Sequence, residues 1–120
     1  EHVFVEKEKL IQWNPAKIFV DTGSYDLVMN DLAAGSVLAQ SLQAVKNGQL
    51  YTVLPYNWYT TNFETVLANA FYIGKVLYPE QFKDINPETK ADEIYAKFVG
   101  KGVYAEMKKM YGGFRRVEVR

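Results

Sequence analysis

The chain has 120 residues, enough for one domain with a buried core, and its 14 basic and 14 acidic residues leave no net charge to favour nucleic acid. It has no cysteine and a single histidine, His2, which excludes disulfides, thiolate metal sites and cysteine nucleophiles. A histidine-dependent triad or zinc site would need His2 at the terminus, so we expect neither a resident metal nor a cofactor. No apolar run approaches the roughly 18 residues of a membrane span.

The first half of the chain alternates between helical and strand patterns. Asn14-Pro15 stops an initial helix, Ser24 is placed to cap the next one, Gly48 ends a third, and Pro55 ends the second strand. The predicted elements are a helix over 5–13, a strand over 17–20, helices over 25–32 and 36–45, and a strand over 49–54.

The second half is predicted to be helical over 61–78, 86–100 and 103–111, followed by either a short terminal strand or a loose tail. Thr61 and Glu64 have the spacing of a capping box, and Asn86-Pro87 has the pattern of a helix start. Strands separated by helices predict an α/β fold with a parallel sheet and flanking helices. The face expected to be core in the first of these helices is formed by Phe63, Val66, Leu67, Ala70, Phe71, Gly74, Leu77 and Tyr78.

Asp21-Thr22-Gly23-Ser24 follows the first strand and has the form of an aspartic-protease catalytic loop. That protease fold is almost wholly β, whereas the chain after Ser24 is mostly helical in pattern, so the protease hypothesis is the weaker one. In a parallel α/β sheet, the loop that leaves the carboxyl end of a strand is where ligands bind. Asp21 and Ser24 could equally be only turn and cap residues.

The second strand leads into an aromatic loop, Pro55 to Glu64, just before a helix start. If the two strands are neighbours, this loop lies beside Asp21-Thr22-Gly23. Exposed aromatic side chains there suit a flat, partly apolar ligand. The alternative is that Trp58 and one tyrosine fold back over the core, and Glu64 is explained as well by the capping box as by a site.

Three segments carry a family resemblance: "LIQWNPAKIFVDTG", "LQAVKNGQLYTVLP" and "ETVLANAFYIGKVLYPEQF". In this order they resemble the C-terminal lobe of the periplasmic-binding-protein family that serves iron-siderophore, haem and vitamin B12 ABC importers. The resemblance covers residues 10–82 well, and 86–113 is similar to the helical C-terminus of some members. It implies that residues 1–120 are a C-terminal ligand-binding lobe, an incomplete part of a longer two-lobed chain.

The resemblance also implies roles for particular residues. Thr60 and Thr61 stand nearest to the position where the family has an acidic permease contact, so Glu64, one turn later, is the expected docking residue. The expected ligand-binding residues, on the first cleft loop and on the aromatic loop, are Asp21, Thr22, Gly23, Tyr25, Tyr56, Asn57, Trp58 and Tyr59.

The function implied is that of an extracytoplasmic substrate-binding component, not an enzyme. It would capture an iron-siderophore, haem or corrinoid-type ligand and deliver it to ABC permease subunits. The alternatives are a small flavodoxin-like enzyme and a regulatory or interaction domain, although no phosphate-binding glycine loop or acidic cluster supports the former. Because strands upstream of Glu1 are expected to be missing, at least one sheet edge should be bare and the isolated chain should self-associate.

Overall fold

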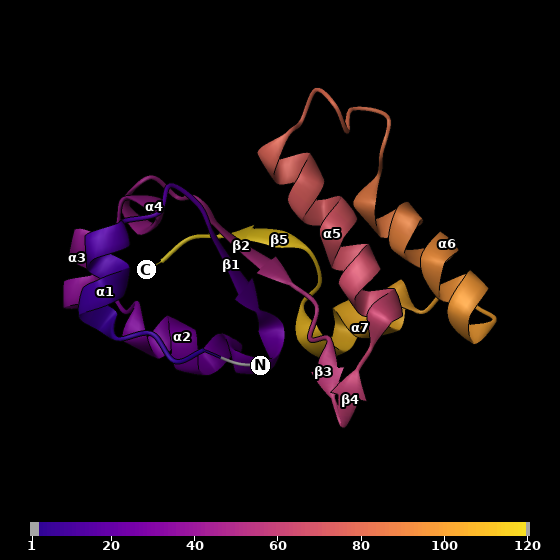
Figure 1. Ribbon diagram of the computed structural model, residues 1–120, viewed down its shortest axis with the longest axis horizontal. Coiled ribbons are helices and arrows are strands. Elements are labelled where there is room, and N and C mark those ends of the chain that lie inside the picture. Colours follow the sequence, from indigo (N-terminus) through magenta and orange to yellow (C-terminus); the bar gives the residue numbers. More distant parts are fainter. Residues whose placement is uncertain (1–2, 120) are drawn as a thin grey trace. The chain divides into compact units, whose positions relative to one another are not determined.

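The computed structural model describes residues 3–119, so His2 lies outside the described range. These residues form two compact units, the first from 3–20, Ser24–Tyr51 and 116–119, and the second from Asp21–Gly23 and Thr52–Arg115. The elements, labelled in Figure 1, are α1 (Lys7–Trp13), β1 (Ile18–Asp21), the 3-10 helix η1 (Thr22–Ser24), α2 (Tyr25–Asp31), α3 (Val37–Ser41), α4 (Gln43–Lys46), β2 (Leu50–Val53), β3 (Asn57–Trp58), β4 (Thr60–Thr61), α5 (Phe63–Leu77), α6 (Pro87–Val99), α7 (Tyr104–Tyr111) and β5 (Arg115–Val117).

The main sheet has three strands in the order β1-β2-β5. β1 and β2 run parallel: the Ile18 N–H donates to the Gln49 carbonyl at 3.0 Å, and four residues further along both strands the Thr22 hydroxyl donates to the Val53 carbonyl at 3.1 Å. β5 runs in the opposite direction, so the sheet is mixed (Figure 1). The predicted α/β class and the parallel strand pair are confirmed, and the C-terminal segment contributes a strand that makes the sheet mixed instead of wholly parallel.

The first unit has a core of aliphatic side chains contributed by its strands and short helices. Leu42 and Leu50 are fully buried in it. The buried residues that form one contact cluster here are Val20, Leu32, Leu38, Leu42, Leu50 and Val117. Removing such a side chain loses both its transfer free energy and its packing contacts, so these residues hold the unit together.

The helix predicted over 36–45 is broken into α3 and α4, and side-chain hydrogen bonds explain the break. The Ser36 hydroxyl caps α3 by accepting from the Ala39 N–H at 3.1 Å. Leu42 is extended, with ψ of 119°, and the Asn14 side-chain oxygen accepts from the Gln43 N–H at 2.8 Å. An asparagine distant in the sequence therefore supplies the N-terminal hydrogen bond of α4. The residue pattern within 36–45 alone could not indicate that Asn14 is the partner.

The second unit packs α5, α6 and α7 around the end of β2. Phe114 lies between two tyrosines, stacked on Tyr72 with ring centroids 4.6 Å apart and on Tyr104 at 5.1 Å. The predicted start of α6 is confirmed, because the Asn86 side chain accepts from two backbone N–H groups of its first turn. The predicted end is confirmed too, with Gly100 in the left-handed region at φ 86°. The buried set is Leu54, Ala68, Ala91, Ile94, Tyr95, Tyr104 and Phe114.

The prediction of which face of α5 is buried was mostly wrong, because only Phe71 among the large apolar residues expected there packs against the second unit's core. Phe63 is 69% exposed and Leu67 is 43% exposed, whereas Thr65, Ala68 and Asn69 are buried. The Thr65 hydroxyl lies 2.9 Å from that of Tyr95, and Asn69 bonds to the backbone of β2's end. Polar side chains with specific partners therefore point inward. The exposed apolar face, which we call the α5 stripe, consists of Phe63, Val66, Leu67, Ala70 and Leu77.

Tyr104 is a buried tyrosine whose ionisation is coupled to folding. Burial and, to a smaller extent, the nearby Glu88 carboxylate together raise its pKa to about 12, against the hydrogen bond that the Phe114 N–H donates to its oxygen at 2.9 Å. In the unfolded chain the hydroxyl would ionise at its ordinary pKa of 10.0. Its contribution to stability is therefore fully present below pH 10 and is lost as the pH rises toward about 12.

We expect the free energy of unfolding to fall with pH above 10, and Tyr104→Phe to reduce that slope because the ionisable group is gone. Urea denaturation at a series of pH values from neutral to strongly alkaline measures the slope of the free energy of unfolding against pH. Equal slopes for wild type and Tyr104→Phe would contradict the assignment to Tyr104.

Candidate functional site

The turn after β1 is closed by its own side chains. The Asp21 carboxylate accepts from the Gly23 N–H at 2.7 Å, and the buried Thr22 hydroxyl is held by the Val53 carbonyl. A Cβ on Gly23 would lie 3.0 Å from the Asp21 carboxylate and 3.3 Å from the Pro55 side chain. The turn thus packs against the residues that follow β2, as expected for two neighbouring parallel strands. Ser24 takes the predicted N-cap position of α2, but its side chain makes no capping bond.

Asp21 in this arrangement is a turn residue, and the structure does not favour the protease hypothesis. We expect Asp21→Asn to change the free energy of unfolding by less than about 1 kcal/mol, since an amide oxygen can accept the same bond from Gly23. We also expect no acid peptidase activity in either protein. Thermal denaturation and a pepstatin-controlled peptide assay measure both. Pepstatin-sensitive cleavage that disappears in Asp21→Asn would contradict this interpretation.

The aromatic loop after β2 is a small hairpin, β3–β4, in which Trp58 pairs with Thr60 and Tyr59 forms the tip. Tyr59 is 98% exposed with φ 61°, and its ring lies edge-on to Trp58 at 5.6 Å. The Asn62 backbone and side-chain N–H groups both donate to the Tyr56 carbonyl, at 2.7 and 3.0 Å. Trp58 is 69% exposed, so the alternative in which it folds back into the core is wrong.

These Asn62 bonds also explain why the predicted capping box is absent. Thr61 belongs to β4, Asn62 takes the N-cap position of α5, and no side-chain cap bond forms there. Glu64 is therefore not occupied in a capping box. It lies in the first turn of α5, where the helix dipole favours a carboxylate.

A pocket of about 330 Å³ lies in the second unit, beneath this hairpin. Among the expected site residues, Gly23, Trp58 and Glu64 line it, whereas Tyr25 belongs to the first unit and packs against that unit's core. Asp21, Thr22, Tyr56, Asn57 and Tyr59 are not among its lining residues. The lining residues are Gly23, Pro55, Trp58, Asn62, Glu64, Thr65, Tyr95, Val99, Val103, Met107 and Tyr111.

Sequence reasoning missed the wall contributed by α6 and α7. Val103, the N-cap residue of α7, recurs at four-residue spacing with Met107 and Tyr111 of that helix, and all three line the pocket together with Tyr95 from α6. The four-residue spacing was visible in the sequence. The spacing alone does not show whether these side chains face the core or a pocket, because that depends on which element lies opposite α7.

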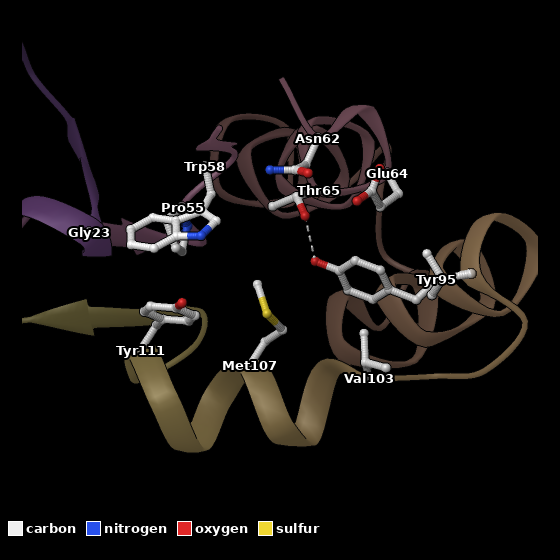
Figure 2. A pocket seen from close by; sticks show the side chains of 11 residues that line it. Gly23, Pro55, Trp58, Asn62, Glu64, Thr65, Tyr95, Val103, Met107 and Tyr111 are labelled. Carbon is white, nitrogen blue, oxygen red and sulfur yellow. Dashed lines mark hydrogen bonds between the residues drawn. The ribbon is translucent and has the colours of Figure 1, made fainter. Parts of the chain in front are cut away.

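The pocket combines aromatic and apolar walls with a few polar groups. Figure 2 shows the Trp58 indole and the Tyr111 ring on one side, the Met107 side chain pointing into the space, and the hydrogen-bonded Thr65 and Tyr95 hydroxyls on the other. Burial raises the pKa of Tyr95, and its bond with Thr65 acts in the opposite direction. Such a pocket is suited to an organic group with an apolar surface and a polar attachment.

Within residues 3–119, no three histidine, aspartate or glutamate side chains are grouped so that they could hold a metal ion. In the same part of the chain, no helix combines the length and the apolar character that crossing a membrane requires.

Comparison with known proteins gives one informative similarity. No family model matches the chain. In an alignment of 99 positions that covers 78% of the chain, it is 27% identical to the molybdate-binding protein MolA of Haemophilus influenzae strain Rd. It spans only about a quarter of that protein, 27% of its length. The similarity gives partial support to the resemblance to binding proteins and agrees with a role other than catalysis, but it does not support a siderophore as ligand.

Proposed function

We propose that this chain is the ligand-binding lobe of a substrate-binding protein that serves an ABC importer. The observation that carries the proposal is the placement of the Asp21–Gly23 turn and the β3–β4 hairpin at the carboxyl ends of two adjacent parallel strands. Ligands of open α/β sheets bind at such strand ends. The similarity to a molybdate-binding protein points to the same class of function.

The proposal extends to the location of this lobe and to the proteins that it contacts. The lobe would be one of two in a longer extracytoplasmic protein, with the ligand held between them. Permease subunits would receive the ligand, and Glu64 would be one contact with them. The exposed hairpin supports this arrangement, because a surface with Trp58 and Tyr59 largely open to solvent is suited to a second contact partner.

Two ligand classes follow from different observations. The relative binds molybdate, which favours a compact oxyanion for this protein as well. The pocket lining favours a metal chelate with an organic body, such as a siderophore, haem or corrinoid, because its walls are aromatic and no Lys, Arg or His belongs to its described lining. We propose the chelate as ligand and molybdate as the second candidate.

Trp58→Ala tests the proposal in the longer protein that contains this lobe. We expect ligand affinity to weaken by about 1–3 kcal/mol, since one aromatic contact is lost. Thermal stability should change little, because the side chain is largely exposed. Calorimetric titration with ferric siderophore, haem, cobalamin and molybdate measures the affinity. Trp13→Ala, which removes a 58% exposed tryptophan from the first unit, is the control. Unchanged affinity in Trp58→Ala would contradict the proposal.

A further inference from the structure

The charge of the second-unit pocket is unusual for a site that would receive an anion. Glu64 is the one charged side chain among the described residues that line it. The ion pairs found among the described residues join Lys7 to Asp31, Lys90 to Glu93 and Lys108 to Glu88, and none includes Glu64. The pocket therefore contains one carboxylate without a cationic side chain to neutralise it.

The rest of the lining determines which kind of cation could use that carboxylate. Trp58 and Tyr111 present aromatic rings to the space, and Met107 points into it (Figure 2). Ring faces attract a cation through their quadrupole, and a polarisable thioether packs well against methyl groups. A bare metal ion would need several oxygen ligands, and no such acidic or histidine group occurs in the described chain.

We propose that this pocket binds a small organic cation with an apolar body, such as a quaternary ammonium group. Glu64 supplies the counter-charge, Trp58 and Tyr111 supply cation–π contacts, and Met107 packs against the alkyl groups. The site goes beyond capture of a transported ligand between two lobes, and in it Glu64 acts as a pocket residue instead of the permease contact proposed above. All its lining residues belong to the second unit, so it requires no second lobe.

The test is a fluorescence titration of the full 120-residue chain with choline and with its neutral isostere, 3,3-dimethylbutan-1-ol. The chain has two tryptophans, so a Trp13→Phe background makes Trp58 the sole indole reporter. We expect saturable quenching by choline and at least roughly tenfold weaker binding of the neutral alcohol, because the alcohol loses both the cation–π and the carboxylate contributions.

Glu64→Gln keeps the shape of the side chain and removes its charge, and it should weaken choline binding by roughly tenfold. Glu106→Gln, on the exposed side of α7, makes the same chemical change outside the pocket and should leave choline affinity within about twofold. Circular dichroism confirms that each variant is folded.

The proposal is overturned if choline does not quench Trp58, if the alcohol binds as well as choline, or if Glu64→Gln binds choline like the wild type. Titration with molybdate or a chelate tests the proposed function separately, and failure there leaves this site unaffected.

Discussion

Replacing Asn69 by leucine should lower the free energy of unfolding by about 3 kcal/mol, the largest loss we expect from one substitution in the second unit. Asn69 is buried in α5. Its side-chain oxygen accepts from the Leu54 N–H at 3.0 Å, and its side-chain N–H donates to the Leu54 carbonyl at 2.8 Å. Leucine has similar volume but offers neither group, so both backbone groups would be buried without a partner.

Urea denaturation monitored by circular dichroism measures this loss. Asn30→Leu on α2 is the matched control, because it makes the same change at an exposed helical position and should alter stability by less than about 0.5 kcal/mol. Because Leu54 precedes Pro55 and the hairpin, Asn69→Leu should also weaken choline binding at the pocket. Stability equal to the wild type would show that α5 is not anchored to β2 through Asn69.

The second large effect concerns the α5 stripe, which leaves Phe63, Leu67 and their apolar neighbours open to solvent. We expect the isolated chain to self-associate at millimolar concentration, since a contiguous apolar face gains free energy when a second copy covers it. Phe63→Glu combined with Leu67→Lys should abolish the association. The pair leaves the net charge unchanged, and glutamate four residues before lysine favours the helix.

Analytical ultracentrifugation over a concentration series measures the association. Leu27→Glu on α2 is the control, because it removes a side chain that is 73% exposed but lies outside the stripe, and it should associate like the wild type. A wild-type chain that stays monomeric throughout, or a double variant that still associates, would contradict the role of the stripe.

Much of the local structure was predictable because its causes are local. Asn86-Pro87 starts α6 and Gly100 ends it, since a side-chain cap, a fixed φ and a left-handed glycine each act within one helical turn. The neighbouring strand ends were also predictable, because parallel strands joined by helices bring their carboxyl ends together. The sequence therefore indicated that, if the two strands were neighbours, the turn at Asp21 and the residues around Pro55 would lie close together.

What could not be predicted depends on partners distant in the sequence. Asn69 and Thr65 turn the polar face of α5 inward because Leu54 and Tyr95 offer them hydrogen bonds, and apolar periodicity alone assigns that helix the opposite face. Asn14 caps α4 from 29 residues away. Tyr111 lines the pocket because the fold places α7 opposite the hairpin, and its place in the sequence does not indicate this.

Isothermal titration of the proposed two-lobed protein with ferric siderophore, haem, cobalamin and molybdate in turn tests directly whether the hairpin of this chain is a ligand-binding surface. We expect saturable binding of one of these ligands with a dissociation constant in the micromolar range or tighter, and weakening of that binding by Trp58→Ala. Absence of binding by all four, or binding that Trp58→Ala leaves unchanged, would contradict the claim that the strand-end hairpin of this chain is a ligand-binding surface.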